Sequence, residues 1–161
     1  MAPQRFPFPN DLPRKRVAAG ALLLDDQRRI LLVNPTYKPQ WEIPGGMVEG
    51  DESPLAACRR EVWEEIGLTI APGVLLSVGY IQGRKPGNDA IRFIFWGGLL
   101  DQTMIAQIRL PATELSEYRL VTLDEAAVLV RPSLHAQLAQ CLANLSDTFS
   151  PSTLQTYWEE A

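Results

Sequence analysis

The chain has 161 residues, enough for one domain with a substantial core, and its hydrophobic content of 46% is ordinary for a globular protein. Its formal net charge of −4 argues against general nucleic-acid binding, which needs a basic surface. Two cysteines, Cys58 and Cys141, are too few for a disulfide framework, and the single histidine, His135, excludes histidine-rich zinc sites.

The N-terminal segment 1–15 contains four prolines and is predicted to be an extended tail. Its Phe6 and Phe8 are candidates for packing on the body or on a partner subunit, so a homodimer stays open beside a loosely ordered terminus. We expect one domain over 16–148 and a C-terminal tail over 149–161.

No signal peptide or membrane span is evident, because the apolar run 18–24 is far too short and is followed by two aspartates. The sequence therefore predicts a cytoplasmic protein without a membrane partner.

Within the body, alternating apolar residues and turn signals predict short strands, followed by two helices near the C-terminus. The expected strands are 17–24, 30–34, 74–82, 90–99, 106–110 and 118–123, and the expected C-terminal helices are 124–129 and 132–145. This order implies an α/β (α+β) architecture in which a mixed sheet lies between helices.

A central helix is predicted between residues 53 and 67. Ser53 is a plausible N-cap, Pro54 suits the first helical position, and Gly67 supplies the stop. Apolar residues recur at helical spacing and should face the core: Leu55, Cys58, Val62 and Ile66.

Three carboxylates share a second face of this helix: Glu61, Glu64 and Glu65. Like charges at this spacing each cost about 0.2–0.5 kcal/mol per pair on an open helix. Arg60 can offset one of them, and a hard divalent cation, Mg²⁺ or Mn²⁺, would remove the remaining repulsion. A solvated acidic face is the bland alternative, but it does not explain the fixed spacing of the flanking residues.

The stretch from Gly46 to Leu68 reads G, five residues, E, seven residues, then R-E-hydrophobic-x-E-E-x-G-hydrophobic. It resembles the complete signature of the Nudix hydrolases, which is called the box below. The flanking segments extend the likeness, since Trp41-Glu-Ile-Pro-Gly-Gly leads into the box and Leu115 to Ala126 is similar to the usual late strand and helix.

The resemblance implies an α/β/α sandwich and hydrolysis of a nucleoside diphosphate linked to another group. Glu61, Glu64 and Glu65 would be the main metal ligands, with Glu52 and the Gly46 backbone at the edge of the metal site. Arg60 would hold the neighbouring carboxylates and loop in place. The cofactor would be Mg²⁺, with Mn²⁺ as an alternative, and the partner a small nucleotide.

Such a site would let a carboxylate accept a proton while water attacks phosphorus. Glu65 or Glu64 is the first choice for this base. Glu117, on the predicted late strand, is the candidate outside the box, although Glu117 and Glu114 also fit exposed loop acids.

The substrate side is less defined. Arg84 and Lys85 could meet a phosphate or could form a solvated hairpin tip. Tyr37 and Trp41 could stack a base, with packing under the box as the alternative for Trp41. Marks of the ADP-ribose, dinucleoside-polyphosphate and NADH-pyrophosphatase types are absent, which favours a nucleoside di- or triphosphate and keeps ADP-ribose and nucleotide-sugars open.

A non-catalytic nucleotide-sensing domain of the same fold is the main competing hypothesis. Such a domain would usually have lost a box carboxylate, whereas this sequence keeps them all. A P-loop NTPase is excluded because no lysine precedes serine or threonine, and a serine hydrolase is unsupported because no G-x-S-x-G occurs.

Overall fold

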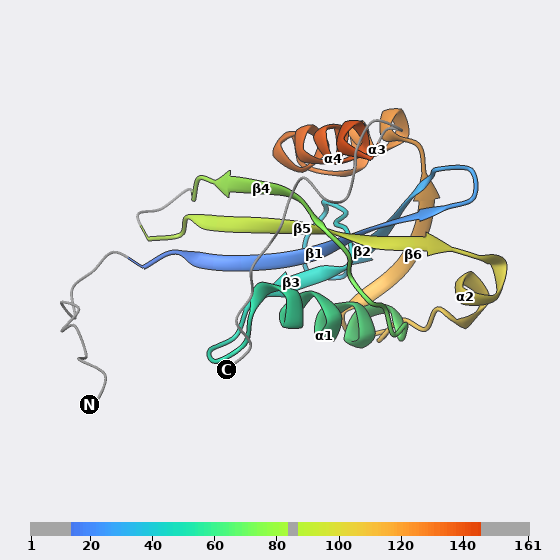
Figure 1. Ribbon diagram of the computed structural model, residues 1–161, viewed down its shortest axis with the longest axis horizontal. Coiled ribbons are helices and arrows are strands. Elements are labelled where there is room, and N and C mark those ends of the chain that lie inside the picture. Colours follow the sequence, from blue (N-terminus) through green and yellow to red (C-terminus); the bar gives the residue numbers. More distant parts are fainter. Residues whose placement is uncertain (1–13, 84–86, 146–161) are drawn as a thin grey trace.

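The computed structural model describes residues 14–83 and 87–145 as a sheet with helices on both faces (Figure 1). The strands are β1 (Arg16–Asp25), β2 (Ile30–Pro35), β3 (Gly45–Met47), β4 (Leu75–Ile81), β5 (Ala90–Leu100) and β6 (Leu115–Val121). The helices are α1 (Pro54–Ile66), α2 (Gln102–Gln107), α3 (Leu123–Leu129) and α4 (Pro132–Asn144). The predicted tails lie outside the described residues, apart from Arg14 and Lys15.

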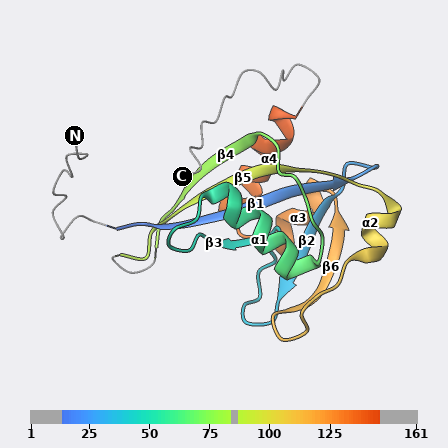
Figure 2. The same cartoon turned by 60° about the horizontal axis from the view of Figure 1, so that its bottom comes forward.

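The sheet has the order β4-β5-β1-β2-β6, and β3 pairs with β1 beside this path. β1 and β5 are parallel, whereas the pairs β1–β2, β1–β3, β2–β6 and β4–β5 are antiparallel. The sheet is therefore mixed, as the sequence predicts. Turning the molecule brings α1 forward across one face, with α3 and α4 behind the sheet (Figure 2).

Strand β1 serves both layers because its side chains alternate between the two faces. Ala19, Ala21 and Leu23 belong to the core under α1, and Leu22 and Leu24 belong to the core under α3 and α4. Both cores are closed to solvent, and the two thiols lie one in each of them. Burial raises the pKa of both cysteines to about 12, in agreement with reduced core thiols.

Helix α1 has the predicted ends. The Ser53 side chain accepts a hydrogen bond from the Ala56 backbone N–H at 3.1 Å, and Pro54 occupies the first turn. Gly67 ends the helix in the left-handed conformation, φ 71°, and its N–H donates to the Trp63 carbonyl. Of the predicted apolar stripe, Cys58, Val62 and Ile66 are fully buried. The helix is thereby fixed against the sheet.

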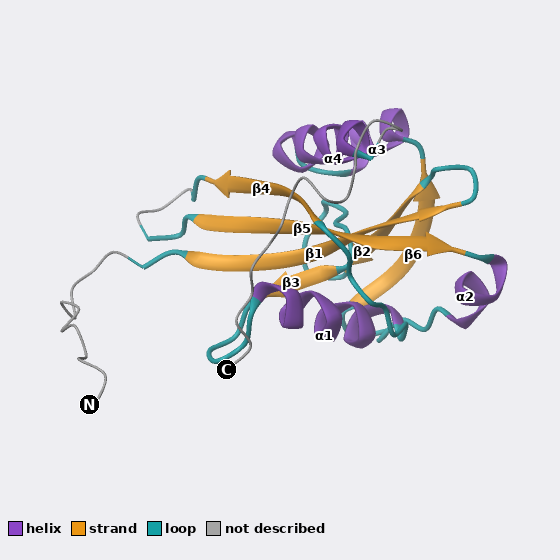
Figure 3. Cartoon of the chain, in the orientation of Figure 1, coloured by secondary structure: helices purple, strands orange, loops and turns teal. Residues whose placement is uncertain are grey.

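The prediction of a strand over 106–110 is wrong, because residues Gln102–Gln107 form helix α2 (Figure 3). Asp101 caps this helix by accepting from the Met104 N–H at 2.7 Å. Ile108 is buried, and Leu110 packs against the same core, after the helix has ended. That alternate burial explains why the pattern resembled a strand.

Strand β6 begins at Leu115, before the predicted start at Tyr118, and the short strand β3 was not predicted. Helices α3 and α4 lie where they were expected, and α3 begins with a capping box in which Thr122 and Glu125 bond each other's backbone. No helix among the described residues has the length and apolar character to cross a membrane.

The β1–β2 turn is built around Asp25, a carboxylate with no exposed surface. Its Oδ1 accepts from the backbone N–H groups of Arg29 and Gln27, at 2.7 and 3.1 Å, and its Oδ2 accepts from Arg29 Nε at 2.8 Å. Burial acts to raise the pKa of Asp25, but these bonds outweigh it and the pKa is lowered. The ionised carboxylate therefore stabilises the turn.

We expect Asp25→Asn to lower the free energy of unfolding by about 2 kcal/mol at neutral pH, because an amide N–H₂ cannot accept from Arg29. Since the folded pKa of Asp25 lies below its ordinary 3.8, the stabilisation is present above that pH and is lost as the pH falls through the folded pKa. Urea unfolding at pH 7 measures the loss of unfolding free energy, and urea unfolding at pH 3 measures how much of the stabilisation is lost at low pH. Asp26→Asn, at the exposed neighbour, is the control, and equal stability of the two variants at pH 7 would contradict the prediction.

Candidate active site

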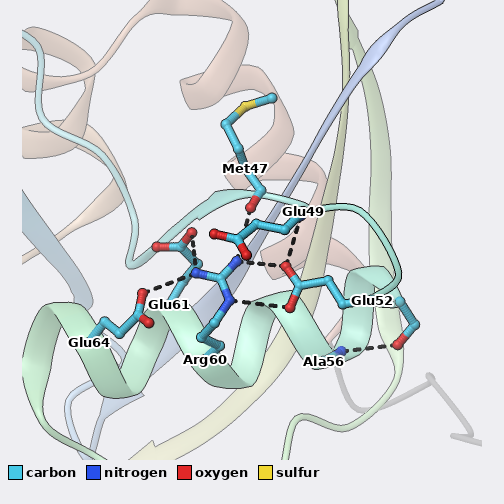
Figure 4. Close-up of polar contacts among 8 residues, drawn as sticks. Met47, Glu49, Glu52, Ala56, Arg60, Glu61 and Glu64 are labelled. Atoms are coloured by element: carbon cyan, nitrogen blue, oxygen red, sulfur yellow. Dashed lines mark hydrogen bonds and ion pairs between the residues drawn. The ribbon is translucent and has the colours of Figure 1, made fainter.

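The loop that leads into α1 is held against the helix by Arg60 (Figure 4). Its guanidinium donates to Glu52 at 2.6 and 3.2 Å, to Glu61 and Glu64 at 3.0 Å, and to the Met47 carbonyl at 3.1 Å. One side chain thus joins three carboxylates and β3. These contacts agree with the positioning role that the resemblance implies for Arg60.

The carboxylates around Arg60 differ in their surroundings. Hydrogen bonds from Arg60 hold the pKa of Glu52 below its ordinary value. Burial raises the pKa of Glu61, against the effect of Arg60. Glu64 is the most exposed of the three carboxylates.

Glu65 points away from Arg60 and toward β3. Its Oε2 accepts from the Gly45 N–H at 2.8 Å. Burial raises the pKa of Glu65 to about 8 against this hydrogen bond, and the negative charges of Glu61 and Glu114 add to the rise. Glu65 is therefore a desolvated carboxylate that forms no ion pair within residues 14–83 and 87–145, although the charge of Lys38 acts to lower its pKa.

The residues fit a hard divalent cation in their chemistry, because the donors are anionic oxygens. A Cβ at Gly46 would overlap the Glu61 carboxylate, so any larger residue at this position would displace that group. Within the described ranges, however, no three acidic, histidine or cysteine side chains converge as a metal site. The reason lies in the contacts above, in which Arg60 engages Glu61 and Glu64 while Glu65 turns to Gly45.

A pocket of about 330 Å³ adjoins this cluster. Its floor is the part of β1 where Ala18 and Gly20 replace the leucines that fill the core further along the same face. Glu65, Gly45 and Gly46 line one side. The charged residues of the other walls are Arg16, Lys38, Glu42, Arg92 and Arg131.

The predicted substrate residues fall in different places. Tyr37 is 74% exposed and lines the pocket, with the Lys38 ammonium 5.5 Å from its ring centroid. Trp41 is buried in the core under α3 and α4, not under the box helix α1, and the Arg119 guanidinium lies 4.8 Å from its ring centroid. Arg84 and Lys85 lie outside the described residues.

Glu117 lies on β6 opposite Asn34 and forms an ion pair with Arg119 at 3.0 Å. It does not line the pocket. Glu114, just before β6, is the acid from this region whose charge acts on Glu65. Glu117 is thus a strand residue and not a loop acid, and its catalytic role stays a prediction.

Sequence reasoning missed the cationic wall of the pocket. Arg92 stands in the otherwise apolar strand β5, and a charge inside a buried strand is unusual enough to have marked it. Arg131 and Arg16 carry no such signal, because each lies at the end of an element, where charged residues are common.

Comparisons with known proteins agree with this geometry. The family model described as NUDIX domain matches residues 14–145. Diphosphoinositol polyphosphate phosphohydrolase 2 of Rattus norvegicus is 40% identical over 73 residues, which are 45% of this chain and 41% of the rat protein. A MutT-like protein of Streptomyces ambofaciens is 33% identical over 66 residues, 41% of this chain and 43% of that protein. The matches thus span about two fifths of the length of these curated relatives.

Among solved structures, the MutT protein of Methanosarcina mazei Go1 superposes with a TM-score of 0.72 at 23% identity, covering 84% of this chain and 99% of that one. This likeness supports the fold. Because the family model spans nearly all the described residues and the box lies on the expected loop and helix, the chain belongs to the NUDIX domain family.

Proposed function

We propose that this chain is a divalent-metal-dependent pyrophosphohydrolase that cleaves a nucleoside diphosphate linked to another group, with a nucleoside di- or triphosphate as the preferred class. The observation that carries the proposal is the intact carboxylate cluster of α1 beside a pocket with cationic walls. Mg²⁺ or Mn²⁺ would be held by Glu61, Glu64 and Glu65, with Glu52 and the Gly46 backbone at the edge. The bound cation would neutralise phosphate oxygens and lower the pKa of a water.

The chain's own residues would supply positioning and proton transfer. Glu65 is our choice for the group that accepts the proton of the attacking water, because the Gly45 N–H fixes one of its oxygens and the side chain lines the pocket. Arg60 would act through its neighbours, because its hydrogen bonds fix the positions of Glu52, Glu61 and the Met47 carbonyl. Tyr37, exposed at the pocket, is positioned to stack a base.

The test is a hydrolysis screen of the purified chain with Mg²⁺, with Mn²⁺ and with EDTA, in which chromatography resolves the products. The panel contains canonical and oxidised nucleoside triphosphates, nucleoside diphosphates, ADP-ribose, nucleotide-sugars, diadenosine polyphosphates and diphosphoinositol polyphosphates. We expect cleavage that requires the metal and is strongest for one nucleoside class. No turnover together with ligand-induced thermal stabilisation would replace the proposal by a nucleotide-sensing domain.

The other expectations follow from the sequence alone and stay predictions: a cytoplasmic location and the absence of nucleic-acid partners, with a homodimer left open.

A further inference from the structure

Arg92 is the feature of the pocket that the carboxylate cluster does not explain. It lies on β5, on the same face as Ile94, and its side chain is 13% exposed. Its Nη1 is buried and has no hydrogen-bond partner within the described structure. A guanidinium cannot shed its proton at physiological pH, so an unfilled buried donor of this kind calls for an acceptor.

The nearest carboxylate does not supply that acceptor. Glu42 Oε2 lies 3.9 Å from Arg92 Nη2, too far for a hydrogen bond, while Glu42 Oε1 accepts from Lys38 Nζ at 2.9 Å. One carboxylate is thus shared between two cations. Arg92 is consequently held by proximity to a charge, without the bidentate geometry that makes arginine–carboxylate pairs strong.

Two further arginines increase the positive charge of the same pocket. Arg131, the exposed N-cap residue of α4, forms no ion pair within the described ranges. The Arg16 guanidinium donates to a neutral group, the Asn88 carbonyl. Burial lowers the pKa of Arg92, and the charge of Arg131 adds to this effect while Glu42 opposes it. The walls away from Glu65 therefore carry four cations and one carboxylate.

We propose that Arg92, with Arg131 at the rim, binds a phosphate group of the substrate that lies outside the diphosphate being cleaved. This inference rests on the proposed function for the identity of the ligand as a substrate. A phosphate offers several acceptor oxygens and enough charge for two repelling guanidiniums, whereas the neutral carbonyl of a base would leave the positive charge uncompensated. The preferred substrates are accordingly those that carry at least one phosphate in addition to the diphosphate that is cleaved.

The first test measures phosphate binding without turnover. Isothermal titration calorimetry with inorganic tripolyphosphate, in EDTA, is run on the parent chain and on Arg92→Gln, Arg131→Gln and Arg59→Gln. Arg59 is exposed on α1 and lies outside the pocket, so its variant matches the change in net charge. We expect at least tenfold weaker binding in the two pocket variants and unchanged binding in Arg59→Gln.

Three outcomes overturn the inference. The parent chain does not bind millimolar tripolyphosphate, or Arg59→Gln weakens tripolyphosphate binding as much as the pocket variants do. In the third outcome, the pocket variants lose binding of guanosine or uridine and keep binding of tripolyphosphate. The last result would mean that Arg92 reads a base. Should Arg92→Gln fail to fold, Arg131→Gln decides alone, because its exposed side chain contributes no buried contact.

The second test separates this inference from the proposed function. In the hydrolysis screen, the pocket variants should raise KM at least tenfold for substrates with the additional phosphate, with a smaller change for those without it. Turnover by the parent chain with no such difference overturns the inference alone. If the parent chain hydrolyses nothing but the pocket variants still bind tripolyphosphate more weakly than the parent, the proposed function is overturned and the phosphate site stands.

Discussion

Glu65→Gln should lower kcat about 10³-fold, the range observed when a positioned general base is removed. The variant should fold normally, because the amide oxygen can still accept from the Gly45 N–H and an amide cannot ionise at this buried position. The metal-free variant should therefore unfold at an equal or higher temperature than the parent chain. Steady-state kinetics with the best substrate of the screen and a thermal melt in EDTA measure the two effects.

The matched control is Glu49→Gln, an exposed acid in the same box loop whose backbone N–H, and not its carboxylate, contacts Glu52. It should retain kcat within about twofold, as expected for a surface substitution away from the reacting groups. Retained activity in Glu65→Gln would remove Glu65 from the mechanism. Retained activity in Glu61→Gln as well would remove the metal site.

Gly46→Ala is the second change with a large expected effect. A Cβ at this position would overlap the Glu61 carboxylate, and because the overlap is with a side chain and φ is not positive, the carboxylate has to move while the backbone keeps its course. We expect kcat to fall about 10²-fold, the effect of misplacing a catalytic group by about 1 Å. Kinetics at saturating Mg²⁺ measure this fall.

Two neighbouring glycines test the explanation with the same substitution. A Cβ at Gly50 meets nothing within 4 Å, so Gly50→Ala should behave as the parent chain does. A Cβ at Gly45, where φ is 150°, would overlap the backbone of Ala19 and Gly20, so Gly45→Ala should destabilise the fold by about 3 kcal/mol. Equal activity of the Gly46 and Gly50 variants would show that the Glu61 position does not limit the reaction.

Helix α1 was predictable from the sequence because its determinants are local. Ser53, Pro54 and Gly67 act within a turn of the chain, and the apolar spacing fixes the face that packs. The mixed sheet between helices follows from the order of elements. The box carboxylates were identified by spacing, which the resemblance to the family converts into roles.

Non-local features could not be predicted in the same way. β3 has three residues, two of them glycine, and exists because β1 offers it a partner, so no strand propensity reveals it. Helix α2 competes with a strand pattern of similar strength, and the Asp101 cap decides between them. The division of the carboxylates between Arg60 and Gly45 depends on tertiary contacts that spacing does not encode.

The parallel pairing of β1 with β5 has a consequence for how the molecule is assembled. Arg16 lies opposite Ala90 and Asp25 opposite Leu100, so the middle of the sheet closes only when segments far apart in the chain meet. Such contacts give high contact order and slow folding. During synthesis β1 emerges before β5, and the later pairing of the two strands places Arg92 opposite Ala18. The pocket beside Glu65 is thus complete only after β5 has paired with β1, whereas α1 can form as soon as its own residues are available.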